Sequence, residues 1–117
     1  MTNRNKSGIL AMVVFMLFAG VSSAFAQSQA STGQITGVVT DSTGAVVPNA
    51  SIKAVNNSTG AAKTTSTSDS GIYQFILLQP GRYTVSASGS GFEELSKEAV
   101  VNVGRTVDVN FELGWEG

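Results

Sequence analysis

The sequence predicts an all-β protein that folds as a sandwich of seven short antiparallel strands. From residue 34 onward, apolar and polar residues alternate with a period of two, and no helical period appears. Clusters of Gly, Asn, Ser and Pro separate these runs at regular spacing, which is typical of a β-sandwich. The alternation also argues against an all-parallel sheet, because strands of such a sheet are apolar on both faces.

A secretory signal peptide is expected to precede the sandwich as a short helix. Arg4 and Lys6 give a basic start, residues 8–21 are almost wholly apolar, and small residues follow. This order predicts signal peptidase cleavage after an Ala-x-Ala site, at Ala24, Ala26 and Gln27. The apolar run is shorter than the ~20 residues that cross a bilayer, so no membrane span is expected in the mature chain. The predicted organisation is a signal peptide at 1–26, a linker at 27–33, a sandwich at 34–113 and a tail at 114–117.

The first three strands follow from alternation and turn chemistry. Residues 34–41 form the first strand, and Gly44 supplies the positive φ of the turn after it. Pro48 keeps the residue before it extended. Residues 50–55 alternate cleanly and form the second strand. Residues 63–68 are rich in Thr and Ser with a weak apolar face, which predicts an edge strand.

The next two strands carry the aromatic residues. Residues 72–78 form a strand with Tyr73 and Phe75 on one side. A Gln-Pro-Gly turn follows, and Pro before Gly predicts type II geometry. Residues 82–88 then place Tyr83 on the apolar face of the fifth strand. Both tyrosines are expected in the core rather than at a ligand.

The last two strands complete the pattern. Residues 92–98 are mostly polar, and residues 99–103 form the sixth strand with Val103 on its apolar face. Residues 106–113 alternate strictly and predict one continuous final strand.

Four strings in this order resemble the carboxypeptidase regulatory-like domain family: Gly37 to Asp41 with Gly44 to Ala50, Asp69 to Phe75, Leu78 to Val85, and Gly91-Phe92. The resemblance implies a transthyretin-like (prealbumin-like) Greek-key sandwich. It also implies that the motif residues are scaffold positions in turns and hairpins rather than catalytic ones. These are Gly37, Asp41, Gly44, Pro48, Asp69, Gly71, Tyr73, Phe75, Pro80, Gly81, Tyr83, Gly91 and Phe92.

The proteins in which domains of this family occur suggest the role of this domain. A domain that directly follows a signal peptide resembles the amino-terminal periplasmic domain of TonB-dependent, Oar-like outer-membrane receptors. The expected partner is then a protein or the receptor's own downstream barrel, and the expected location is the periplasm, the outer membrane or outside the cell. The alternatives are a carbohydrate-binding module of the starch-binding-like class and a surface adhesin or stalk domain. No barrel follows residue 117 here, so the chain is either a stand-alone domain or the first piece of a receptor.

Composition excludes several chemistries. Without His or Cys, a zinc peptidase site and a Ser-His-Asp triad are both excluded. No cofactor, no metal and no enzyme activity are expected. After the leader is removed the net charge is −3, so nothing favours nucleic-acid binding. Asp41 and Asp69 are expected to cap their own turns rather than bind calcium.

Three further surface features each have a structural and a functional interpretation. Lys53 and Asn110 are the candidates for an adhesin-type isopeptide crosslink, but both fall on the polar side of their strands, so none is expected. The adjacent Glu93 and Glu94 would point to opposite faces of a strand and are expected in solvent. Trp115, the only Trp, is expected to pack on the sandwich rim, with a sugar-stacking platform as the alternative.

Overall fold

The computed structural model describes residues 31–116, which form an all-β fold. Its strands are β1 (Gly33–Asp41), β2 (Ser51–Asn56), β3 (Ala62–Ser66), β4 (Ile72–Leu78), β5 (Gly81–Ser88), β6 (Leu95–Val101), β7 (Thr106–Asp108) and β8 (Phe111–Leu113). Within these residues no helix is long and apolar enough to cross a membrane. The predicted leader helix and Ala24, Ala26 and Gln27 lie outside the described residues.

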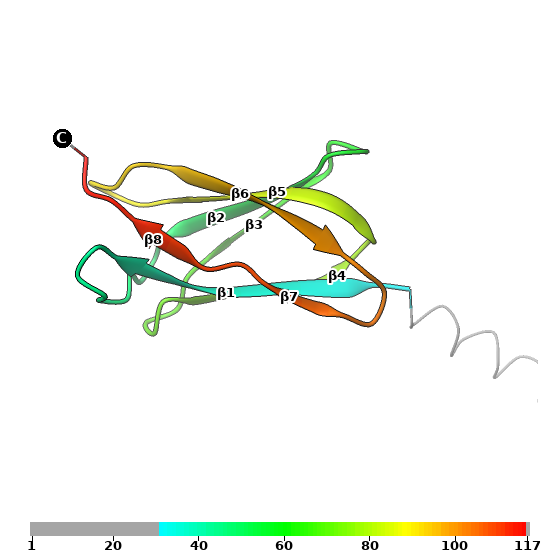
Figure 1. Cartoon of the computed structure of the whole chain (residues 1–117), viewed down its shortest axis with the longest axis horizontal. Helices are drawn as coiled ribbons and strands as arrows, with labels where there is room; N and C mark the ends of the chain where they lie inside the picture. Colours follow the sequence, from blue (N-terminus) through cyan, green and yellow to red (C-terminus); the bar gives the residue numbers. More distant parts are fainter. Residues whose placement is uncertain (1–30, 117) are drawn as a thin grey trace, which may run out of the picture. The chain divides into compact units, whose positions relative to one another are not determined.

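Two sheets face each other. One contains β4, β1 and β7, with β8 also paired to β1, and the other has the order β3-β2-β5-β6. Figure 1 shows β5 and β6 in the upper layer and β1 and β7 in the lower one. The predicted β-sandwich is therefore confirmed, and β3 is an edge strand, as its weak apolar face indicated.

The predicted final strand is wrong in two respects. Residues 106–113 form two short strands rather than one, so the described chain has eight strands instead of seven. Both β7 and β8 run parallel to β1, whereas an antiparallel arrangement was expected. Val109 and Asn110 interrupt the ladder opposite Gly37 and Val38, while the register stays the same on both sides of the gap. Sequence alternation cannot detect this, because the side chains keep alternating through the interruption.

The sixth strand begins earlier than predicted. β6 starts at Leu95 and pairs along its whole length with β5, from Ala87 opposite Leu95 to Gly81 opposite Val101. Its first four residues are exposed, so alternation had no apolar face to reveal them. Backbone pairing with β5 recruits this polar segment. Val103, expected on the buried face, lies in the turn after β6 and is 50% exposed.

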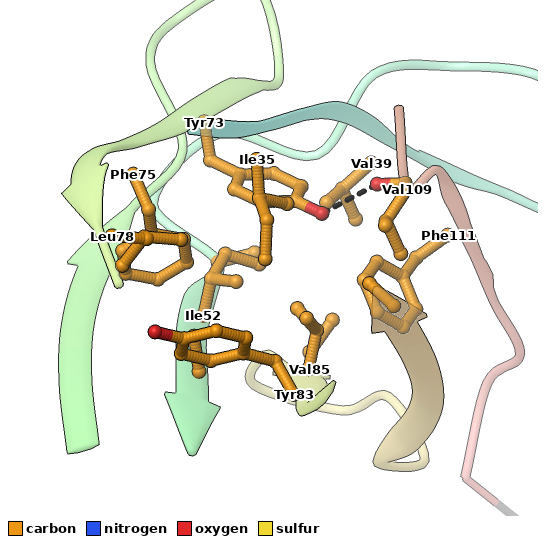
Figure 2. Packing of buried hydrophobic residues seen from close by; sticks show 14 of the residues in the cluster. Ile35, Val39, Ile52, Tyr73, Phe75, Leu78, Tyr83, Val85, Val109 and Phe111 are labelled. Carbon is orange, nitrogen blue, oxygen red and sulfur yellow. Dashed lines mark hydrogen bonds between the residues drawn. The ribbon is translucent and has the colours of Figure 1, made fainter. Parts of the chain in front are cut away.

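The core consists of alternate residues from both sheets, as the period-two pattern predicts. Tyr73 and Phe75 of β4 face Tyr83 and Val85 of β5 across the interior, and Phe111 of β8 joins them (Figure 2). Tyr73 lies edge-on to Phe75, with 5.9 Å between the ring centroids and 68° between the ring planes. Such pairs add about 0.5–1.5 kcal/mol beyond simple burial. The aromatic positions of the hairpin motifs are thus core positions.

The turn between β4 and β5 is not the expected type II turn. Gly81 has φ of 149°, far from the ~80° that the third residue of that turn needs. Just before this turn, Leu77 adopts φ of 54° in a bulge of β4, where the register with β1 shifts between Ile35 opposite Phe75 and Gly33 opposite Leu78. Its side chain is 66% exposed. A bulky residue in the left-handed region is strained and is a place to look for function.

Candidate functional site

The described residues hold no cluster of side chains that could bind a metal ion. Among residues 31–116 there is no group of three or more His, Cys, Asp or Glu side chains that could hold a metal. The acidic residues are scattered over turns and strand exteriors. Glu93 and Glu94 lie in a loop rather than in the strand that their prediction assumed, and both are exposed. The remaining candidate positions are the motif residues, the rim of the sandwich and the cavities.

Tyr73 and Gly37 organise the interrupted end of the β1 sheet. The Tyr73 hydroxyl donates to the carbonyl oxygen of Val109, a bond drawn dashed in Figure 2. A side chain at position 37 would have its Cβ 1.9 Å from that same oxygen and 2.6 Å from Cε1 of Tyr73. Gly37 is therefore required because the Val109 carbonyl and the Tyr73 ring lie too close to β1 for a side chain at position 37. No turn requires a glycine at this position. Burial raises the pKa of Tyr73, which keeps the hydroxyl protonated as a donor.

Two further bonds satisfy the backbone where β7 and β8 separate. The N–H of Val109 donates to Thr36 O at 2.8 Å. The N–H of Val38, which would otherwise lack a ladder partner, donates to the Asn110 side-chain oxygen at 2.9 Å. From the other sheet, Lys97 of β6 donates to Asn110 O at 2.6 Å. The sequence did not single out Asn110 or Lys97 for these roles, because the partner backbone comes from distant parts of the chain.

Asp41 caps its own turn, as expected. Its Oδ1 accepts from the Thr43 hydroxyl at 2.6 Å and from the backbone N–H groups of Thr43 and Ala45. The Thr43 hydroxyl contributes most to holding the pKa of Asp41 below its usual value. Gly44 has φ of 87° in this turn, which only Gly adopts without strain. The turn is structural and leaves the carboxylate engaged with the backbone.

The second acidic turn differs from its prediction. Within the described residues Asp69 makes no side-chain hydrogen bond, and Ser68 caps the turn instead. The Ser68 hydroxyl oxygen accepts from the N–H groups of Ser70 and Ile72, each at 3.3 Å. Gly71 has φ of 74°, and a Cβ there would lie 2.8 Å from Val39 O and 2.9 Å from Val46 Cβ. The turn motif therefore serves tight packing against β1.

One cavity of about 250 Å³ opens between the β2–β3 turn and the β4–β5 turn. Its polar lining includes Asn56, Lys63, Gln79 and Tyr83, and Leu77 is among the apolar residues that line it. The Tyr83 hydroxyl donates to Gln79 O at 2.7 Å, which ties β5 back to the turn. Of the motif residues only Tyr83 lines this cavity. Sequence reasoning missed it, because its lining comes from four strands and two turns that only the folded chain brings together.

The predicted rim position of Trp115 agrees with the structure. Its ring stacks on Phe92, with centroids 4.2 Å apart and an interplanar angle of 28°. Two backbone bonds, from Glu93 N to Gly114 O and from Glu116 N to Gly91 O, hold this segment in place. The Trp115 side chain is still 57% exposed, so part of the ring faces solvent.

The isopeptide candidates are on the outside, as expected. Lys53 is exposed on β2 and Asn110 is exposed between β7 and β8, in different sheets. Their separation agrees with the prediction that they form no crosslink.

The family model of the carboxypeptidase regulatory-like domain matches residues 34–114. The chain belongs to this family. The match covers every strand from β1 to β8, and with it all the motif positions described above. A sequence comparison with curated proteins found no match.

Solved structures share the fold at low identity. The TIE protein of Bacillus anthracis superposes with a TM-score of 0.64 at 21% identity, covering 73% of this chain and 17% of that one. GBS52, the minor pilin of Streptococcus agalactiae, gives 0.61 at 17% identity over 74% of this chain and 46% of the pilin. Catechol 1,2 dioxygenase of Acinetobacter radioresistens gives 0.62 at 13% identity over 78% and 54%. This chain thus spans less than two thirds of each, and the likeness shows a shared β-sandwich.

Proposed function

We propose that this protein is a non-catalytic, exported interaction and scaffold module, the amino-terminal periplasmic domain of a TonB-dependent receptor-like protein. The non-catalytic part of this proposal is supported by the structural roles of the family motif residues. Its aromatic residues build the core, and its glycines permit turns and close approaches. A scaffold needs rigidity and a folded surface, and these contacts supply both.

Export is supported by the amino-terminal sequence. Residues 1–26 combine a basic start, a short apolar run and an Ala-x-Ala site. If the chain is expressed with this leader in a Gram-negative host, the exported form should begin at Gln27. Amino-terminal sequencing of the periplasmic fraction tests this, with Ala24→Lys as the variant that should block cleavage. Recovery of uncleaved wild-type chain in the cytoplasm would refute export.

The receptor setting is tested by reading the gene downstream of codon 117. A plug followed by about 20 or more amphipathic strands would support it, because outer-membrane transporters use barrels of that size. A stop codon at that point, with a soluble periplasmic product, would refute the receptor setting while leaving the scaffold role intact.

A second candidate function is carbohydrate binding at the rim, favoured by the Phe92–Trp115 stack. A Trp ring held on one face and open to solvent elsewhere is a surface on which a sugar ring can pack. A glycan array probed with the protein should then give hits that Trp115→Ala abolishes. Leu95→Ala, at another exposed apolar residue, is the control. Hits that are absent or unchanged in Trp115→Ala would rule this function out.

A further inference from the structure

We propose that the cavity beside Asn56 binds a carboxylate attached to a short branched aliphatic group. The carboxyl terminus of a peptide ending in Leu and a free acid of the same shape both present this chemistry. The cavity lies between two turns, one joining β2 to β3 and the other joining β4 to β5. This proposal does not depend on the scaffold role or on the receptor setting.

Asn56 is buried beside the cavity with its side-chain amide in a defined orientation. The residue is only 5% exposed, and its side-chain oxygen accepts from the N–H groups of Ser58 at 2.9 Å and Thr59 at 3.2 Å. Because both partners are donors, the oxygen must face them, and the amide nitrogen must face the other way. A Cβ built on Gly81 would lie 3.7 Å from this nitrogen, which places it toward the β4–β5 turn.

The Asn56 amide nitrogen is a donor held ready for a ligand. Within the described residues this nitrogen has no hydrogen-bond partner. Every fully buried side-chain nitrogen or oxygen in that part of the chain does have a partner, so the Asn56 nitrogen is not fully buried. The nitrogen must therefore reach open space, and for a residue this deeply buried that space is the cavity it lines. Because that space is open to water, water satisfies the amide in the free protein, and a carboxylate oxygen can take the place of that water.

The charge of the side chains that line the cavity favours an anionic ligand. The side chains around the cavity include the cation Lys63 and donors such as Thr59 and Gln79, but no carboxylate. Lys63 therefore gives the cavity a positive charge, whereas acidic residues outnumber basic ones in the described chain as a whole. A carboxylate can accept from the Asn56 amide and from Lys63 together, and charge-assisted hydrogen bonds are the strong ones.

Part of the lining is aliphatic. Leu77, Leu78 and Ala61 contribute to it, and Leu77 is 66% exposed with φ of 54°. Residues held in a sparsely populated backbone conformation cluster at ligand-binding sites, and Leu77 is such a residue in the lining of this cavity. An aliphatic group in the cavity would cover Leu77 and remove its apolar surface from water.

The size of the cavity limits the ligand. Pockets for drug-sized molecules occupy about 300–1,000 Å³, and this one has about 250 Å³. One leucine-sized group with its carboxylate is therefore what the site can take. Affinity for so small a ligand should be weak, with Kd on the order of 1 mM.

The test is an NMR titration of the ¹⁵N-labelled full chain with 4-methylpentanoate. We expect saturable shifts of the Asn56 side-chain amide and of the Leu77 and Gln79 backbone signals, and at least tenfold weaker binding of the neutral 4-methylpentanamide. A second arm compares an acetylated tripeptide ending in Leu with its carboxyl-terminal amide. Tighter binding of the free-carboxylate peptide than of 4-methylpentanoate would identify a peptide terminus as the source, and equal binding a free acid.

Two variants and a matched control separate binding from folding. Asn56→Asp keeps the oxygen that caps the turn but replaces the donor with a charged acceptor, so binding should be lost. Lys63→Gln, at an exposed position, should weaken binding about tenfold. Lys53→Gln removes an exposed cation outside the cavity and should leave Kd unchanged. Absence of saturable shifts, equal binding of the neutral amide, or unchanged Kd in Lys63→Gln would overturn the proposal.

Discussion

The hydrogen bond from Tyr73 to Val109 makes the sharpest stability prediction. Tyr73→Phe deletes one hydroxyl, keeps the ring and leaves the shape of the core almost unchanged. The Val109 carbonyl then has no partner at a position where Tyr73 is 2% exposed and Val109 is 6% exposed. The variant tests whether this bond holds the β7–β8 segment against β1.

The magnitude follows from burial. A buried acceptor left without its donor costs about 1–3 kcal/mol. Burial here is nearly complete, so we expect Tyr73→Phe to lower the free energy of unfolding by about 2 kcal/mol. For a domain of this size, each kcal/mol shifts Tm by about 4–8 °C. The expected decrease in Tm is therefore about 8–16 °C.

Tyr83→Phe is the matched control. It removes the other core tyrosine hydroxyl, whose acceptor Gln79 O lies at the cavity and is reachable by water. Water can replace that bond, so the loss should be about 0.5–1 kcal/mol. Urea unfolding and calorimetry of both variants supply the comparison. If Tyr73→Phe costs no more than Tyr83→Phe, the reasoning about the buried carbonyl is refuted.

Four further predictions concern backbone and pH. Gly37→Ala should destabilise by about 3 kcal/mol or more in urea unfolding, because its Cβ would meet Val109 O at 1.9 Å; a smaller cost would mean that β1 shifts freely. Leu77→Asn should raise stability by about 0.5–1 kcal/mol, since Asn tolerates the left-handed φ of 54°; a lower Tm would show that Leu77 packs more than its exposure indicates. The lowered pKa of Asp41 contributes stability above the ordinary value of 3.8 that is lost as pH falls below it, so Asp41→Asn should flatten the acid limb of the urea midpoint against pH. The raised pKa of Tyr73 contributes stability below the ordinary value of 10.0 that is lost as pH rises above it, and Tyr73→Phe should flatten the alkaline limb.

Much of the fold could be read from local pattern. Alternation identified the buried residues of β1, β2, β4 and β5, because the pleat of a strand sends successive side chains to opposite faces. It failed at the start of β6, where neither face is buried and only pairing with β5 forms the strand. It also failed to divide the last strand, because the interruption depends on Gly37 and Tyr73 from elsewhere in the chain.

The candidate binding site was almost invisible in the sequence. In the sequence Asn56 is an ordinary turn residue. Its buried position, with the amide nitrogen directed toward the cavity, arises only when the β4–β5 turn folds beside it. Lys63 reads as a solvent-exposed residue of an edge strand. Leu77 reads as one more apolar position of β4, and its positive φ belongs to the bulge where the register with β1 shifts.

The sequence by itself determined that this is a β-sandwich whose motif residues build turns and core, because alternation and turn chemistry are local properties. Only the tertiary structure decided that the final strand splits and runs parallel to β1, and that an amide, an ammonium group and a strained leucine surround one cavity. The physical reason is the same in both cases. These features depend on contacts between segments far apart in the chain, and no local pattern encodes which backbone group will lie opposite which side chain.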